Sequence, residues 1–162
     1  MNNDKFKITS SAFEDGKVIP TKYANVGVTG GKNLSIPLSW ENSPKETKSF
    51  ALAIVDLHPI ANNWVHWLVI NIPSSATQID ESASTTTKMP KGSVELNNTF
   101  GTLGYGGPQP PKGSGPHKYE VLIYALNVEK LELDRYSTLI AFKKTIEGKI
   151  IATAKIVGIY ER

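Results

Sequence analysis

The sequence predicts a mainly β protein, an antiparallel β-sandwich or barrel-like domain with one or two α-helices packed outside it. Short apolar segments of strand length recur along the chain, whereas a helical spacing of apolar residues is confined to one segment near its end. No repeat or shift in composition divides the 162 residues, which are enough to bury a core. We therefore expect a single domain over residues 1–162.

The predicted strands follow from alternation and from apolar runs. They cover residues 5–10, 33–40, 49–56, 64–72, 118–126 and 149–160. Pro37 places the second of them at a sheet edge or a bulge, because proline donates no ladder hydrogen bond. The third, SFALAIVD, is too short for a helix and rich in Ile and Val, so we expect a buried strand that ends at Asp56. Residues 73–91, rich in Ser and Thr without a period, predict a long surface excursion.

The segment WVHWLVINI, residues 64–72, carries apolar side chains on both faces of a strand. Strict alternation puts His66 on the face of Trp64 and Leu68. A strand that is covered on both sides belongs at the centre of a sheet, so we expect His66 in the core or at its edge.

One helix is predicted, from Arg135 or Ser137 to Glu147. Its apolar residues recur at helical spacing, and Gly148 follows where a glycine commonly ends a helix. We expect this helix to cover a face of the sheet.

The loop between residues 101 and 117 is rich in glycine and proline, which excludes a regular helix. The pairs Pro110-Pro111 and Gly115-Pro116 stiffen it, because a residue before proline is held in an extended conformation. The loop leads to His117 and directly into a predicted strand. Shaped loops of this kind carry sites more often than cores do.

The charge pattern disfavours nucleic acid as a partner. The net charge is only +3, the lysines are spread along the chain, and the two arginines are Arg135 and Arg162. The absence of cysteine excludes disulfides and thiolate chemistry. The N-terminal residues hold no apolar signal segment and no stretch reaches membrane-spanning length, so we expect a cytoplasmic protein, monomeric or homodimeric, without a membrane span.

Two segments resemble the signature blocks of the phosphatidylethanolamine-binding protein family, which includes Raf kinase inhibitor protein-like members. They are DLHPIANNWVHWLVINIP (residues 56–73) and NTFGTLGYGGPQPPKGSGPHKYEVLIYAL (residues 98–126), and the tail GKIIATAKIVGIYER is also similar to the bacterial and archaeal branch. The resemblance extends over nearly the whole chain from Asn33 onward. It implies a large antiparallel β structure with peripheral helices, and a small pocket for phosphate or a phosphorylated head group.

The resemblance also implies which residues line that pocket. Carried over by motif, the ligand-binding residues are Asp56, His66, His117, Tyr119, Trp64, Tyr105, Gly107 and Pro108. Where the family usually has Asp-Pro-Asp-Ala-Pro, residues 56–60 read DLHPI, so His58 replaces the second carboxylate and joins the candidates. The pocket should therefore be less negative than in relatives that keep both carboxylates.

The residue types suit an anion. Imidazoles, a tyrosine hydroxyl and loop amides supply directed donors without a permanent cation. Asp56 would repel an anion, so we expect it to accept a proton from an imidazole, that of His66, and to favour its charged form. No cofactor and no bound metal are expected.

Three classes of function are compared. The resemblance favours a non-enzymatic protein that binds small anionic or phosphorylated ligands and modulates a kinase or a protease. A metal-dependent hydrolase built from His58, His66, His117 and Asp56 is an alternative. A protein-interaction module with a vestigial pocket is another. A hydrolase built on Ser114, His117 and Asp56 is disfavoured, because Ser114 follows no strand-to-helix turn and the sequence shows no evident oxyanion hole.

Overall fold

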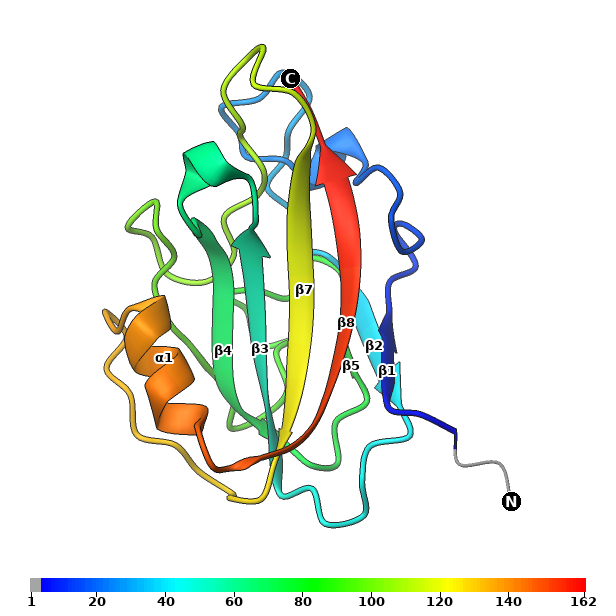
Figure 1. Ribbon diagram of the computed structural model, residues 1–162, viewed down its shortest axis with the longest axis vertical. Coiled ribbons are helices and arrows are strands. Elements are labelled where there is room, and N and C mark those ends of the chain that lie inside the picture. The colour runs from blue at the N-terminus through cyan, green and yellow to red at the C-terminus, as the bar shows by residue number, and fades with distance from the viewer. Residues whose placement is uncertain (1–3) are drawn as a thin grey trace.

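The computed structural model describes residues 4–162 and has two antiparallel β-sheets and one α-helix (Figure 1). The three-stranded sheet has the order β1 (Lys7–Thr9), β2 (Leu38–Glu41), β5 (Gln78–Ile79). The five-stranded sheet has the order β6 (Val94–Glu95), β4 (Val65–Pro73), β3 (Ser49–Asp56), β7 (His117–Leu126), β8 (Ile150–Tyr160). The helix α1 spans Leu139–Ile146, and two 3₁₀-helices span Thr21–Tyr23 and Pro59–Ala61. The mainly β, antiparallel prediction is confirmed; within residues 4–162 the sheets do not close into a barrel.

Two apolar clusters cover the two faces of the five-stranded sheet. Between the sheets, Trp40 of β2 packs in one cluster with Phe50 of β3 and Val121 of β7. On the opposite face, Phe142 and Ile146 of α1 lie in a second cluster with residues of β3, β4 and β7. The helix therefore covers a sheet face, as its spacing of apolar residues predicts. Within residues 4–162, no helix has the length and apolar composition needed to cross a bilayer.

β3 lies in the middle of the larger sheet, and all its residues are buried, as the apolar run predicts. It pairs with β7 in antiparallel register, so that Asp56 at its end lies opposite Tyr119 near the start of β7. Residues far apart in the sequence thereby meet at one end of the sheet.

Some details differ from the sequence predictions. β2 is the central strand of its sheet, not an edge; Pro37 is tolerated because it precedes the first strand residue, where no ladder hydrogen bond is lost. β5 lies within the segment predicted as a surface excursion, and β6 just after it. A two-residue strand shows no measurable period, so the sequence pattern could not reveal either one.

Candidate functional site

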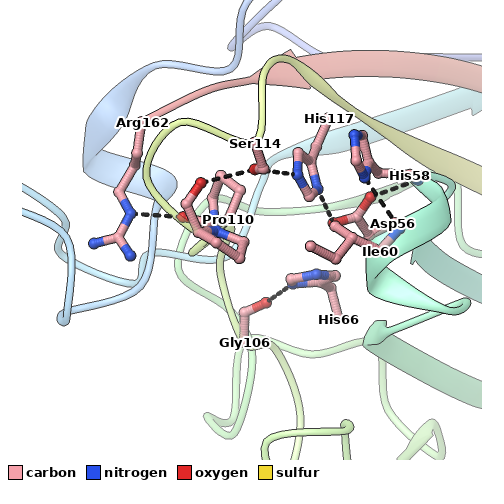
Figure 2. A network of polar contacts seen from close by, with 10 residues as sticks. Asp56, His58, Ile60, His66, Gly106, Pro110, Ser114, His117 and Arg162 are labelled. Carbon is pink, nitrogen blue, oxygen red and sulfur yellow. Dashed lines mark hydrogen bonds and ion pairs between the residues drawn. The ribbon is translucent and has the colours of Figure 1, made fainter.

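A cavity of about 380 Å³ lies where β3 ends and β4 and β7 begin. It is lined by Asp56, Ile60, Ala61, Trp64, His66, Phe100, Gln109, Pro110, Pro111, His117 and Tyr119. Figure 2 shows that side chains from β3, β4 and the proline-rich loop converge here. The structure thus brings five of the sequence-predicted site residues to one cavity.

A bulge in β4 aims His66 at this cavity. Val55 of β3 pairs with Val65, but the preceding residue of β3, Ile54, pairs with Trp67, so His66 is an extra residue without a partner in that register. Bulges turn side chains away from strict alternation and are frequent beside functional sites. His66 accordingly leaves the face of Leu68 and packs edge-on against the ring of Tyr119.

A buried hydrogen bond joins Asp56 to His117. Nδ1 of His117 donates to Oδ2 of Asp56 over 2.6 Å, and both side chains are almost fully buried. The other carboxylate oxygen accepts the backbone N–H of His58 at 2.9 Å. The negative charge of Asp56 is therefore held by two donors of the protein itself.

The expectation that Asp56 pairs with His66 is wrong. Nδ1 of His66 lies 2.6 Å from the carbonyl oxygen of Gly106, which can only accept, so Nδ1 carries the proton. Burial lowers the pKa of His66 to about 4, against the opposing effects of the Gly106 carbonyl and the charge of Asp56. His66 is therefore neutral near neutral pH, and its Nε2 is a hydrogen-bond acceptor.

Two other lining residues carry donors without a partner. Among residues 4–162, neither the hydroxyl of Tyr119 nor Nε1 of Trp64 makes a hydrogen bond, although both atoms are buried. Burial raises the pKa of Tyr119, and so does the Asp56 carboxylate, which approaches the hydroxyl without the geometry of a hydrogen bond, so the hydroxyl keeps its proton. A buried donor that is left unpaired costs free energy, and such groups are commonly satisfied by a ligand or by water.

His58 does not line the cavity. Its ring stacks on the ring of His117 with centroids 3.9 Å apart, and its Nδ1 accepts the N–H of Ile60 and so caps the short 3₁₀-helix that begins at Pro59. Its position is behind His117, where it restricts the rotation of that ring.

Tyr105, Gly107 and Pro108 also lie outside the cavity lining. The hydroxyl of Tyr105 donates to the carbonyl of Tyr23, and the carbonyl of Pro108 accepts the N–H of Asn25. These residues attach the loop to the segment around residues 23–25 and so hold the cavity wall in place.

The residues of the lining that sequence reasoning missed are Ile60, Ala61, Phe100, Gln109, Pro110 and Pro111. Pro110 and Pro111 belong to the stiffened loop at which the sequence predicts a site, so their composition carried a usable signal. Phe100 carried none, because a lone aromatic residue in a loop shows no period. Arg162 was also missed as a structural element: its Nε donates to the carbonyl of Pro110, and its own carbonyl accepts the N–H of Gly113.

The proposed metal ligands are not arranged as a metal site. In the part of the chain that the structure describes, no group of three or more His, Asp or Glu side chains could hold a metal ion. Asp56 and His117 bond to each other, and His66 turns its Nδ1 to a carbonyl group.

A sequence profile of the phosphatidylethanolamine-binding protein family matches residues 9–161. The chain belongs to this family. Among its relatives, UPF0098 protein YbcL of Escherichia coli (strain K12) is 37% identical over 161 residues, which cover 96% of this chain and 87% of YbcL. A UPF0098 protein of Methanothermobacter thermautotrophicus is also 37% identical, over 96% of this chain and 98% of its own length.

Solved structures agree with the family and the fold. The crystal structure of E. coli YbcL, described as a member of the mammalian PEBP family, matches with a TM-score of 0.91 over 98% of this chain and 99% of YbcL at 36% identity. A carboxypeptidase Y inhibitor, solved in complex with its cognate proteinase, matches with a TM-score of 0.56 at 18% identity, over 96% of this chain and 82% of the inhibitor. That likeness shows a shared fold. The sequence-based assignment to the phosphatidylethanolamine-binding protein family is thus confirmed.

Proposed function

We propose that the cavity binds a small tetrahedral anion, free phosphate or the phosphate of a phosphorylated ligand, and that the protein acts by binding and not by turnover. The observation that carries this proposal is the pair of buried, unpartnered donors, the Tyr119 hydroxyl and Trp64 Nε1, on residues that line the same cavity as His117. An anion would supply the acceptors that these donors lack.

The charge of Asp56 does not oppose such a ligand strongly. Both of its oxygens are engaged by donors of the protein, with Oδ2 on His117 and Oδ1 on the N–H of His58. When His117 carries a second proton, the pair is neutral overall, and the anion meets an imidazolium ring at the cavity wall.

His66 adds a preference for an anion that can donate a hydrogen bond. Its Nε2 is an acceptor near neutral pH, because Nδ1 is bonded to the carbonyl of Gly106 and the pKa of the ring is lowered to about 4. The preferred anion therefore brings a proton of its own. Hydrogen phosphate has a P–OH group, whereas sulfate has the same shape and charge but no proton at neutral pH.

Calorimetric titration tests the proposal with three proteins and two anions. Wild type should bind phosphate in preference to sulfate at neutral pH. Tyr119→Phe should bind phosphate about tenfold more weakly or worse, because one hydrogen bond to a charged group is lost. Its stability should change little, because the hydroxyl has no partner in the protein to lose.

The matched control is Tyr105→Phe, which also removes one buried tyrosine hydroxyl. That hydroxyl donates to the carbonyl of Tyr23 at 2.8 Å, so the change should cost about 1 kcal/mol of stability and leave phosphate affinity unchanged. Equal phosphate affinity in wild type and Tyr119→Phe would remove Tyr119 from the site. A wild type that binds neither anion would overturn the proposal itself.

The expectation of a kinase or protease as partner stays a prediction. The likeness to the carboxypeptidase Y inhibitor, at 18% identity, concerns the fold and does not identify a partner for this chain.

A further inference from the structure

Ser114, in the loop that leads to His117, extends the bond between His117 and Asp56 by one contact that the anion site does not require. Oγ of Ser114 lies 2.8 Å from Nε2 of His117, and Nδ1 of the same ring lies 2.6 Å from Oδ2 of Asp56 (Figure 2). A hydroxyl, an imidazole and a buried carboxylate are thus joined in the order that activates a serine nucleophile.

The hydrogen bonds of Ser114 and His117 determine where their protons lie. Oγ of Ser114 is also 2.7 Å from the carbonyl oxygen of Pro111, which only accepts. While Nε2 of His117 carries a proton, it donates to Oγ, and the hydroxyl proton points to Pro111. Once Nε2 is unprotonated, the hydroxyl proton turns to it, and Pro111 still accepts the N–H of Ser114. In this second state the imidazole is a base in contact with the hydroxyl.

The chain contains the same turn a second time without the histidine. Residues 90–93 and 111–114 both have the sequence PKGS, and in each turn the serine N–H and hydroxyl reach the carbonyl of the proline. Gly92 and Gly113 both have positive φ. Ser93 and Ser114 are both half-buried, so their local geometry and exposure are matched. Contact with His117 distinguishes Ser114.

Space and a donor are available beside Ser114. A Cβ atom built on Gly113 or on Gly115 would meet nothing within 4 Å, so there is open space beside both neighbours of the serine. The N–H of Gly115, directly after the serine, makes no hydrogen bond among residues 4–162. It can donate to the oxyanion that forms when a carbonyl group is attacked. Arg162 fixes the turn through its bonds to Pro110 and Gly113.

We propose that Ser114 is an acyl-accepting nucleophile, with His117 as its base and Asp56 as the residue that positions the base, and that it takes acyl groups from activated carboxylic esters. In the step, Oγ of Ser114 forms a bond to the ester carbonyl carbon, and the bond from that carbon to the leaving oxygen breaks. The hydroxyl proton passes to Nε2 of His117 and then to the leaving oxygen. Hydrolysis of the acyl-serine would also form an oxyanion, and a single donor stabilises it weakly. The expected product is therefore a stable acyl-serine.

The test treats the purified protein with p-nitrophenyl acetate and maps acetyl groups by peptide mass spectrometry. Ser93 is the control within the same molecule. Acetylation of Ser114 should exceed that of Ser93 by about a hundredfold, the effect expected of a positioned base. Ser114→Ala should lose the modified peptide, and His117→Gln should reduce acetylation of Ser114 to the level of Ser93. Equal acetylation of the two serines in wild type would overturn the proposal.

A second experiment does not depend on His117 variants folding. The protein has no cysteine, so Ser114→Cys and Ser93→Cys each contain one thiol. The thiol next to His117 should react with iodoacetamide much faster than the thiol in the matched turn, because an adjacent imidazole favours the thiolate. Equal rates in two folded variants would contradict the proposal. Phosphate titration of Ser114→Ala tests anion binding in the cavity without the serine hydroxyl. Anion binding and acylation of Ser114 can therefore fail independently of each other.

Discussion

Asp56 is the residue on which the polar contacts of the site depend. Its side chain is buried and accepts from Nδ1 of His117 and from the N–H of His58. A buried ion or donor that loses its partner keeps its cost of desolvation and gains nothing in return. The position of the His117 ring, and with it the geometry of Ser114, therefore rests on this carboxylate.

Replacing Asp56 with Asn should destabilise the protein by about 3 kcal/mol, because the amide cannot balance a charged imidazole or accept as strongly. Urea unfolding at neutral pH measures this. The matched control is Asp80→Asn, an exposed carboxylate that accepts from Gln78, whose replacement should stay within about 0.5 kcal/mol. Similar losses in the two variants would show that burial of Asp56 carries no special cost.

For single residues, the sequence named side chains that prove to share one cavity, but it did not reveal their hydrogen-bond partners. Asp56, His66, His117 and Tyr119 could be named from motifs, and all of them line the cavity. The partner of Asp56 depends on the register between β3 and β7, which no single-strand pattern contains. The orientation of His66 depends on one extra residue in β4, and a bulge is visible only in how two strands pair.

At the scale of elements, the proline-rich loop is positioned by close backbone contact with the segment around residues 23–25. A Cβ atom on Gly107 would lie 2.2 Å from the carbonyl oxygen of Tyr23 and 2.7 Å from backbone atoms of Ala24 and Asn25. Backbone on both sides of this contact leaves no flexible side chain to move away. The glycine is therefore required for close approach of two loops.

Gly107→Ala should cost about 3 kcal/mol or more, through overpacking of backbone against backbone. The comparison is Gly27→Ala, where the added Cβ meets the end of the Gln109 side chain, which can rotate away. Thermal unfolding of both variants checks the difference. If Gly27→Ala proved as destabilising as Gly107→Ala, the contact with Tyr23 would not be what fixes the loop.

The strands illustrate where element prediction succeeds. β3, β7 and β8 were predicted to within a residue of their observed bounds, because each is a long segment with an apolar run or clear alternation. β5 and β6 form by pairing with β2 and β4, and a two-residue segment is too short to show an alternation of apolar residues in the sequence.

At the scale of the whole molecule, His66 couples stability to pH. The folded protein keeps the imidazole neutral, with a pKa lowered from 6.5 to about 4, mainly by burial. The unfolded chain therefore takes up a proton at a higher pH than the folded one. The stabilisation is fully present above pH 6.5 and is lost as the pH falls from 6.5 towards 4. The shift corresponds to about 3 kcal/mol.

The measurement is the free energy of unfolding of wild type and His66→Asn at a series of pH values across this window. Asn can still donate to the carbonyl of Gly106 but does not titrate, so its curve should fall less steeply with acid. The carboxylates contribute equally to both proteins and cancel in the difference between the curves. That difference should shrink by about 3 kcal/mol between neutral pH and the acid end of the window. Parallel curves would mean that His66 takes up its proton at the same pH in the folded and unfolded chain, and that burial does not keep its Nε2 unprotonated below pH 6.5.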